Sequence, residues 1–332
     1  MYRKIMSFLE AWKDSEHRKP LILQGARQVG KTYSILEFGR THYENVAYFN
    51  FETNPKLNET FEENISPDYL IPILSHIAGQ TIVREKTLIV FDEVQLCERA
   101  LTSLKYFCED APDYHIIVAG SLLGVAVNRA KFSFPVGKVD MKTLYPMDME
   151  EFMVACGESA LVEQIKKCFA EDTPLPSALH DAAMQLYRQY LIVGGMPECV
   201  MQFVETKDYI LVRHTQDTIL ASYLNDMSKY NNLNEIKKTR LAYDNITVQL
   251  SKKNTRFQYK LIKKGGRASE FENAIEWLCL SGIVSQVYKV EQIKKPLENY
   301  RDIDAFKIYV SDLGLLCAKK DLAANDVLYM VE

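Results

Sequence analysis

The sequence predicts an α/β fold that opens with a doubly wound parallel sheet flanked by helices. Apolar segments of strand length alternate with segments of helical periodicity, which is the pattern of such a domain. The strand segments are residues 21–23, 46–51, 87–91 and 115–120. Residues 87–91 and 115–120 are continuous apolar runs, as is typical of strands buried on both faces of a parallel sheet.

The segments between these strands have helical character. Residues 33–40 and 100–109 are expected to be helices, and residues 55–78 form a mixed helical region with two proline breaks. After about Tyr145-Pro146 the strand pattern stops, and long helical segments continue to about residue 231 with a loop at 173–176. We therefore expect a sheet domain at residues 1–145 and a helical lid at residues 146–231.

The last third, residues 232–332, is expected to be a small α+β domain that is winged-helix-like. Ser269 and Glu272 have the spacing of a capping box, and Phe271, Ala274, Ile275 and Leu278 share one helical face. Gly282 is expected to end this helix. Extended segments near 283–290 and 306–310 follow it. A helix followed by such segments suggests a winged-helix-like unit.

Composition excludes several classes of protein. The 332 residues are 47% hydrophobic and 25% charged, which is typical of globular chains of two or three domains. The charged N-terminus does not resemble a signal peptide, and no uncharged apolar run is long enough to cross a membrane. The seven cysteines lack CxxC spacing, which disfavours both a disulfide framework and a zinc site. We expect a cytoplasmic protein.

The chemistry is predicted by one loop. Residues 25–32, GARQVGKT, fit the phosphate-binding pattern GxxxxGK[ST], and they lie between an apolar strand and a helix as that motif requires. Lys31 is expected to reach the β- and γ-phosphates of ATP, and Thr32 to bind Mg²⁺. The expected nucleotide-binding residues are Gly25, Arg27, Gln28, Val29, Gly30, Lys31, Thr32 and Tyr33.

Two further positions complete the predicted site. Asp92 and Glu93 follow the strand at 87–91, where Asp92 can hold a Mg²⁺-bound water and Glu93 can polarise the attacking water. Ser121 follows the next strand and is expected to sense the γ-phosphate. We assign catalytic roles to Glu93, Lys31 and Ser121, and metal binding to Thr32 and Asp92.

Each assignment has a purely structural alternative. The loop glycines can be turn residues and Lys31 a solvated helix start, while Asp92-Glu93 can simply solvate a strand end. Ser121 can be a helix N-cap, with or without a sensor role. Residues 194–197, GGMP, are most simply a turn. The combination of loop, acidic strand end and third strand favours the phosphate-binding interpretation.

In these motifs the chain resembles a family of bacterial and archaeal AAA-type ATPases that carry an uncharacterised C-terminal domain. The resemblance covers nearly the whole chain through GARQVGKT, FDEVQ, AGSLLG, LYPMDMEEF, GGMPE and YVSDLGLL. It implies an ASCE-type P-loop core, a helical lid and a C-terminal part with a winged-helix-like element.

The sequence departs from the family at one point. Similar proteins usually carry a Gly-Arg pair where this chain has Gly137-Lys138, and a lysine cannot supply the bidentate geometry of arginine. The γ-phosphate contact is therefore left open among Arg27, Arg129 and Arg213, in cis or from a neighbouring subunit. Similar proteins also often continue past the point where this chain stops, which leaves open whether a distal segment is missing.

Charge is unevenly placed along the chain. Residues 229–267 hold eleven basic and two acidic residues in a chain of net charge −4, which suggests phosphate contacts with DNA. The helix that would enter a groove carries Glu270, Glu272 and Glu276 and no basic residue, so it disfavours reading of the major groove. A solvated face, or a contact with the acidic remainder of the chain, is the structural alternative.

Three functions are consistent with these observations. The first is a Mg²⁺-dependent ATPase that acts as a conformational switch on an unknown protein client or through self-association. The second is a P-loop kinase, which the low arginine content of residues 144–227 disfavours. The third is a DNA-associated regulator that uses ATP as a conformational ligand. We favour the first, with the third as the alternative.

Overall fold

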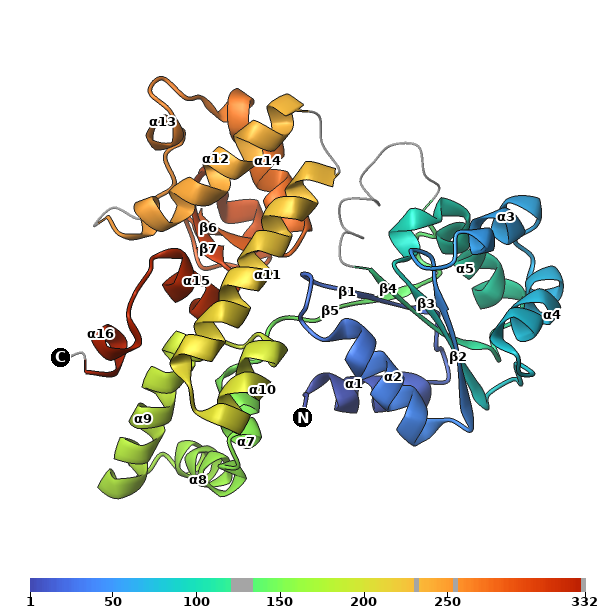
Figure 1. Cartoon of the computed structure of the whole chain (residues 1–332), viewed down its shortest axis with the longest axis horizontal. Helices are drawn as coiled ribbons and strands as arrows, with labels where there is room; N and C mark the ends of the chain where they lie inside the picture. Colours follow the sequence, from blue (N-terminus) through green and yellow to red (C-terminus); the bar gives the residue numbers. More distant parts are fainter. Residues whose placement is uncertain (121–133, 230–232, 253–255, 330–332) are drawn as a thin grey trace. The chain divides into compact units, whose positions relative to one another are not determined.

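The chain forms two compact units, Arg3–Tyr145 and Pro146–Glu332, with Met1–Tyr2 grouped with the second. The computed structural model describes residues 1–120, 134–229, 233–252 and 256–329. Figure 1 shows the labelled helices and strands of each unit. None of the helices in these ranges combines the length and the apolar character that a bilayer span needs. All seven cysteines are free thiols.

A five-stranded sheet organises the first unit. Its order is β2-β3-β4-β1-β5, and every neighbouring pair is parallel. The strands are β1 (Leu21–Gln24), β2 (Asn45–Asn50), β3 (Thr87–Asp92), β4 (His115–Gly120) and β5 (Asp140–Thr143). This confirms the predicted parallel α/β fold. Because the strands all run the same way, the residues that follow β1 and β3 lie at the same edge of the sheet.

Helices cover both faces of this sheet (Figure 1). They are α1 (Ile5–Lys13), α2 (Lys31–His42), α3 (Lys56–Glu63), α4 (Pro67–Ala78) and α5 (Glu98–Asp110), with a short 3₁₀ turn, η1 (Val94–Leu96). The core on the face of α3, α4 and α5 includes Phe51, Phe61 and Phe91, whose rings lie 5.5–5.8 Å apart. As expected of strands buried on both faces, every residue of β3 and β4 is buried.

The second unit is helical, with one small sheet. Its elements are α7 (Met149–Ala155), α8 (Ser159–Ala170), α9 (Ser177–Val193), α10 (Pro197–Thr206), α11 (Tyr209–Lys229), α12 (Leu233–Leu250), α13 (Tyr259–Ile262), α14 (Ala268–Leu280), β6 (Val284–Val290), η2 (Leu297–Tyr300), β7 (Arg301–Val310), α15 (Leu313–Lys319) and α16 (Ala324–Leu328). Strands β6 and β7 pair antiparallel after α14. The winged-helix-like assignment and the division of this unit at residue 231 stay predictions.

Two local predictions need correction. Helix α14 begins at Ala268 with Arg267 as its N-cap and has no side-chain cap, so Ser269 lies inside the helix and forms no capping box. The predicted apolar face of α14 is confirmed, since its four residues are buried. In the region 55–78, Pro67 begins α4 but Pro72 lies within that helix. The region therefore has one proline break between helices rather than two.

A capping box does form at the start of the second unit, at Asp148. The Asp148 side chain accepts a hydrogen bond from the Glu151 backbone N–H at 2.9 Å, and Glu151 accepts one from the Asp148 N–H at 3.1 Å. This satisfies two of the amides that a helix start leaves without partners. It fixes where α7 begins.

Three segments that are distant in sequence converge on the buried carboxylate of Asp312. This side chain accepts hydrogen bonds from the backbone N–H of Gly195 at 2.6 Å and of Leu315 at 2.8 Å. Gly195 in turn accepts from the Met147 N–H at 2.6 Å. A Cβ on residue 195 would lie 1.9 Å from the Met147 carbonyl oxygen, so only glycine fits there. The stretches LYPMDMEEF, GGMPE and YVSDLGLL therefore meet at one point.

The ionisation of Asp312 reflects this environment. Burial raises its pKa to about 6, while hydrogen bonds from the amides of Leu315, Gly195 and Gly314 act in the opposite direction. At neutral pH the group is mostly ionised and accepts these hydrogen bonds. A neutral side chain of the same shape that donates on one side would leave a buried N–H without a partner.

We predict that Asp312→Asn lowers the free energy of unfolding by about 2 kcal/mol, because its amide cannot accept from both backbone N–H groups. Urea denaturation at pH 7.5 measures the change. The control is Asp304→Asn, at an exposed aspartate of the same unit, which should be close to neutral. Equal stability of the two variants would contradict the structural role of Asp312.

Candidate functional site

The loop between β1 and α2 is held in a conformation that glycine makes accessible. Gly25 has φ of 148°, and a Cβ there would lie 2.1 Å from the Leu144 carbonyl oxygen. Gly30 is the N-cap of α2 with φ of 88°, in the left-handed region. Helix α2 therefore starts directly from the loop, and the N–H groups of its first turn are available to an anion.

Lys31, the first residue of α2, is folded back over this loop. Its ammonium donates hydrogen bonds to the carbonyl oxygens of Gly25 at 2.9 Å and Ala26 at 2.8 Å. The residue is only 7% exposed. Burial lowers the pKa of Lys31 to about 8, against the opposing effect of the carboxylates of Glu93 and Asp92. A negatively charged ligand in the loop would stabilise the ammonium form.

The edge of the sheet brings Thr32 and Asp92 together. Thr32 Oγ1 donates a hydrogen bond of 2.8 Å to Asp92 Oδ2, which also accepts one of 2.8 Å from the hydroxyl of Tyr48. The other oxygen, Asp92 Oδ1, accepts from the Glu93 backbone N–H at 2.9 Å. Both oxygens of this buried carboxylate are thus engaged, and its orientation is fixed.

This pair of oxygen ligands is chemically suited to magnesium. A threonine hydroxyl and a carboxylate oxygen are hard donors of the kind that Mg²⁺ prefers beside phosphate oxygens. Thr32 and Asp92 come from different elements, α2 and β3, yet their side chains touch. Their donor set therefore fits the predicted metal site.

Glu93, the residue directly after β3, has an unusual backbone conformation. Its φ of 52° lies in the left-handed region, which is uncommon for a residue other than glycine and is often found at functional sites. Its carboxylate accepts a hydrogen bond from the side-chain amide of Gln95. Burial is the main cause that raises the pKa of Glu93, and the nearby charge of Asp92 acts in the same direction. A raised pKa makes this carboxylate a stronger base while it is ionised.

Gln95 adds a second polar atom beside Glu93. Its Oε1 is buried and, among the described residues, has no hydrogen-bond partner. Such an atom is costly unless something donates to it. A water molecule next to Glu93 is the simplest donor that could satisfy it.

Other predicted residues have different surroundings. Ser121 and Arg129 lie outside the described residues. Lys138 forms an ion pair of 2.8 Å with Glu109 of α5. Arg213, in the second unit, donates hydrogen bonds to the carbonyl oxygens of Ala318 and Leu322. Lys138 and Arg213 are thus engaged with their own units in this structure.

The remaining predicted positions surround the start of α2. Arg27, Gln28 and Val29 form the loop itself, and Gln28 has φ of 65°. Tyr33 lies in the first turn of the helix and is 56% exposed. Its ring is accessible to a planar group next to the phosphate loop.

Two contributors to the site, Tyr48 and Gln95, were not predicted from the sequence. Tyr48 lies on β2, where Asn50 is paired in register with Asp92. The hydroxyl of Tyr48 receives a hydrogen bond from Asn50 at 3.2 Å. A signal was available for β2, because polar residues near the end of a strand beside β3 must face the same edge. For Gln95 the signal was only its distance of two residues from Glu93.

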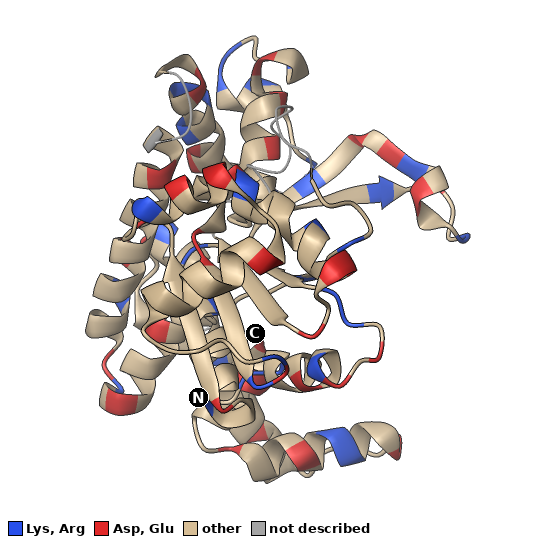
Figure 2. Ribbon diagram, turned by 90° about the vertical axis from the view of Figure 1, so that its right-hand side faces the viewer, with Lys and Arg blue, Asp and Glu red and all other residues tan. Residues whose placement is uncertain are grey.

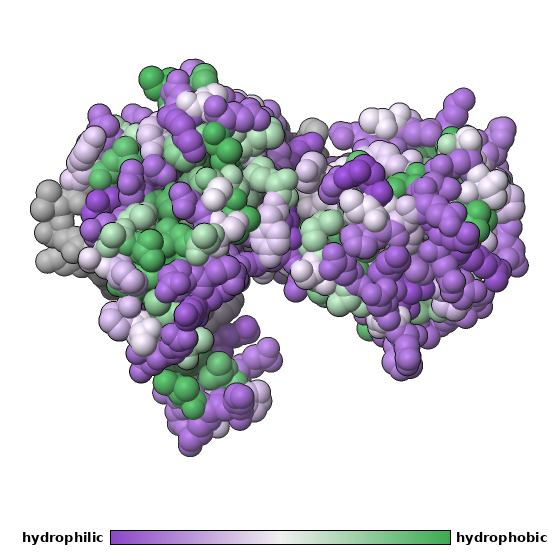
Figure 3. All heavy atoms as spheres, turned by 90° about the horizontal axis from the view of Figure 1, so that it is seen from below, coloured by the Kyte–Doolittle hydropathy of each residue, from purple (hydrophilic) through white to green (hydrophobic). Residues whose placement is uncertain are grey.

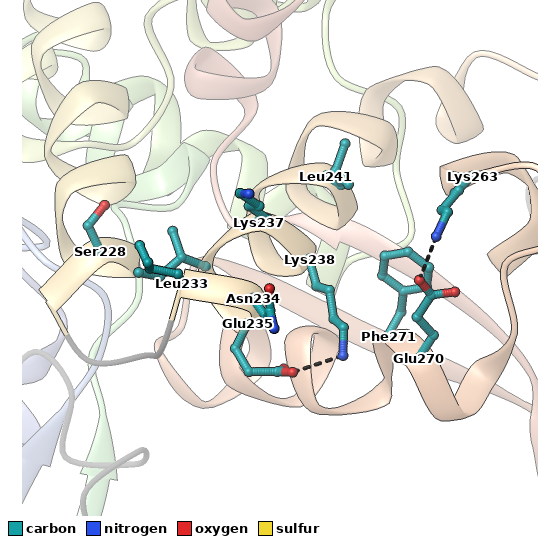
Figure 4. Close-up of a pocket in the computed structure, with 11 residues that line it drawn as sticks. Ser228, Leu233, Asn234, Glu235, Lys237, Lys238, Leu241, Lys263, Glu270 and Phe271 are labelled. Atoms are coloured by element: carbon teal, nitrogen blue, oxygen red, sulfur yellow. Dashed lines mark hydrogen bonds and ion pairs between the residues drawn. The ribbon is translucent and has the colours of Figure 1, made fainter.

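A hollow in the second unit is chemically different. It has a volume of about 1100 Å³ and is lined by residues of α11, α12 and α14 and of the segment between α13 and α14. Figure 4 shows Lys238 directed at Glu235 and Lys263 at Glu270, with N–O distances of 2.9 and 3.1 Å. These lysines are already neutralised by neighbouring carboxylates. The hollow is a weaker candidate for an anion site than the loop of the first unit.

We predict that binding of a phosphate-bearing ligand weakens as pH rises above about 8, because Lys31 then loses its proton and must regain it on binding. Calorimetry in two buffers of different ionisation enthalpy at pH 7 and pH 9 measures the proton uptake. Lys31→Arg keeps its charge, so its uptake should not rise between these values. The same uptake in both proteins would contradict the assignment.

Comparison with known protein families gives two matches, each to a part of the chain. Residues 17–153 match the family described as an AAA domain, and residues 184–326 match a domain of unknown function. No curated protein matches the chain in sequence.

Several solved structures are distantly similar. The ORC1 protein of Aeropyrum pernix in complex with DNA is 12% identical, with 96% of this chain and 91% of that chain covered and a TM-score of 0.32. The ORC2 protein of the same organism is 11% identical, with coverage of 98% and 94% and a TM-score of 0.43. The RuvB Holliday junction branch migration motor of Thermotoga maritima is 14% identical, with coverage of 85% and 87% and a TM-score of 0.37.

The sheet order, the glycine loop and the family match agree with one another. Residues 17–153, which hold the parallel sheet and the glycine loop, match an AAA domain, and residues 184–326 match a domain of unknown function.

Proposed function

We propose that the protein binds ATP with Mg²⁺ in the loop of residues 25–32, hydrolyses it, and uses the nucleotide state as a conformational switch on a partner. The contact between Thr32 and Asp92 at 2.8 Å carries the proposal, since it joins the phosphate loop to the acidic end of β3. An AAA domain supports nucleotide binding. The acidic pair Asp92-Glu93 supports turnover.

Each residue has a role in binding. The N–H groups of the loop and of the first turn of α2 hold the phosphates, and the Lys31 ammonium exchanges its carbonyl partners for phosphate oxygens. Thr32 and Asp92 would hold Mg²⁺, which when bound would neutralise charge on the phosphate oxygens. The Tyr48 hydroxyl keeps the Asp92 carboxylate in place by donating a hydrogen bond to it. Burial raises the pKa of Tyr48 to about 12, so this hydroxyl keeps its proton.

The hydrolytic step uses Glu93 as general base. A water molecule donates one hydrogen bond to the Glu93 carboxylate and is positioned to donate a second to Gln95 Oε1, the buried acceptor beside it. The water oxygen forms a bond to the γ-phosphorus while the bond from that phosphorus to the bridging oxygen of ADP breaks. The water proton passes to Glu93 and is later released to solvent. Ser121 is proposed as the γ-phosphate sensor. Arg27 or Arg129 is proposed as the charge that completes the site, since Arg213 is held by carbonyl oxygens of its own unit.

A protein partner fits the surface of the second unit. The hairpin of β6 and β7 exposes several large apolar side chains, among them Val287, Ile293, Leu297 and Ile303. On the face seen in Figure 3, hydrophobic residues reach the surface in patches between hydrophilic ones. Such patches are typical of protein contacts, whether with a client or with a second copy. The free cysteines are consistent with the cytoplasm, which we propose as the location.

A role with DNA is the alternative. Basic and acidic residues are interspersed along the ribbons in Figure 2. Within the basic stretch, Lys238 pairs with Glu235 and Lys263 with Glu270. These pairs reduce the positive charge available for phosphate contacts. DNA binding is therefore the alternative and not the proposed function.

We predict slow Mg²⁺-dependent phosphate release that falls by at least about a hundredfold in Glu93→Gln, which loses the general base while the loop still binds ATP. Phosphate release and ATP-analogue affinity are measured on the same preparations. Glu98→Gln changes an exposed glutamate five residues away and should keep the wild-type rate. Unchanged phosphate release in Glu93→Gln would exclude this mechanism. Formation of ADP that needs an added acceptor and is not accompanied by free phosphate would favour a kinase.

We also predict that the protein does not bind duplex DNA at low ionic strength. The fluorescence anisotropy of a labelled duplex should stay unchanged when the protein is added, and the duplex should not alter the ATPase rate. The pairing of basic with acidic side chains is the reason. A shift that declines as salt is added, and that is lost when Lys260 and Lys264 are replaced by glutamate, would instead support the DNA-associated regulator.

A further inference from the structure

The side chain of Arg3 is buried next to the phosphate loop, although it belongs to neither the loop nor the acidic strand end. It precedes α1 and is only 4% exposed. Its Nη1 donates a hydrogen bond of 2.9 Å to the Val29 carbonyl oxygen, and its Nη2 donates one of 2.8 Å to that of Tyr145. A buried guanidinium is costly to hold unless its contacts have good geometry. Arg3 therefore joins two backbone segments that are more than a hundred residues apart.

The contact with Val29 sets the direction of a neighbouring N–H group. The Val29 carbonyl and the Gly30 N–H belong to the same planar trans peptide, so they point in opposite directions. When Arg3 holds the carbonyl on its side, the Gly30 N–H must point away from Arg3. Gly30 is the N-cap of α2, and its N–H is one of the loop donors available to a phosphate.

The contact with Tyr145 extends a seam between the loop and the segment after β5. The Leu144 N–H donates to the Gln24 carbonyl oxygen at 2.8 Å, and the Gln24 side chain donates to Thr143 Oγ1 at 3.0 Å. Beside it, the Leu144 carbonyl oxygen occupies the space that a side chain on Gly25 would need. Tyr145 is the last residue of the first unit. We name residues 143–147 the connector.

We propose that Arg3 is a positioning residue for the phosphate loop: it orients the Gly30 N–H for a phosphate and ties the loop to the connector. This inference rests on the proposed nucleotide binding. A phosphate in the loop would bind the N–H of the same peptide whose carbonyl Arg3 holds. Nucleotide binding therefore makes the connector backbone more ordered. The first residues of the chain thereby take part in a site that the sequence motif alone does not include.

The test compares affinities for MgADP by calorimetry. Arg3→Met keeps length and apolar volume but removes both hydrogen bonds, and we expect binding to weaken about tenfold or more. Arg3→Lys keeps the charge but cannot form the fork to two carbonyls, so its affinity should lie between those of the wild type and Arg3→Met. Arg99→Met is the matched control, because Arg99 Nε also donates to a backbone carbonyl, that of Phe61, at 2.7 Å. It should bind MgADP as the wild type does.

Hydrogen exchange of the wild-type protein tests the coupling without any variant. Addition of MgADP should slow exchange in peptides that cover residues 25–32 and also in those that cover the connector. In Arg3→Lys the connector should lose most of this response while the loop keeps part of its own.

The possible results distinguish a failure of the positioning role of Arg3 from a failure of the proposed nucleotide binding. Wild-type affinity in Arg3→Met would overturn the positioning role and leave nucleotide binding intact. If Arg3→Met does not fold, an unchanged connector in the wild-type exchange experiment overturns the coupling. Failure of the wild type to bind MgADP would refute the proposed function, and this inference with it.

Discussion

The carboxylate of Asp92 is the point on which the geometry of the candidate site depends. Its two oxygens accept hydrogen bonds from Thr32, Tyr48 and the Glu93 backbone, so three elements meet on one side chain. That meeting follows from the parallel sheet, because only strands that run in the same direction deliver their ends to one edge. A one-residue shift in the register of β3 would turn Asp92 to the opposite face and separate the glycine loop from its acidic partner.

The sequence was most informative where the chemistry is contiguous. Residues 25–32 occupy one loop and Asp92-Glu93 one strand end, so both were predicted from local pattern, together with the buried strands β3 and β4. Strand β5 was not predicted, because its sequence DMKT has no apolar run and none of its residues is buried. Helix α1 was also left out, although Ile5, Leu9 and Trp12 are its buried residues and have helical spacing.

Side chains that reach the site from elsewhere in the chain could not be found in this way. Arg3 is tied to the site only by tertiary packing, which one sequence does not encode in any spacing. For Tyr48 the sequence held only a general signal, its place near the end of a strand beside β3. The capping box shows a related difficulty, since the same spacing occurs at Ser269 without a cap and at Asp148 with one. The N-cap residue has an extended backbone in both helices, so the difference lies in which residue takes that position. Asp148 is the N-cap of α7, whereas Arg267 is the N-cap of α14 and Ser269 lies in the first turn of that helix.

The hydrogen bond between Asp312 and Gly195 has a consequence for synthesis of the chain. It spans 117 residues, and Arg213 reaches Leu322 across 109. The first unit can complete its sheet once β5 has left the ribosome. In the second unit, the early helices cannot form their contact with Asp312 until that residue emerges. Domains near the N-terminus generally fold first during translation, and contacts of such long range form late. Helices α9 and α10 thus spend most of the translation of the second unit without the carboxylate that fixes the turn between them.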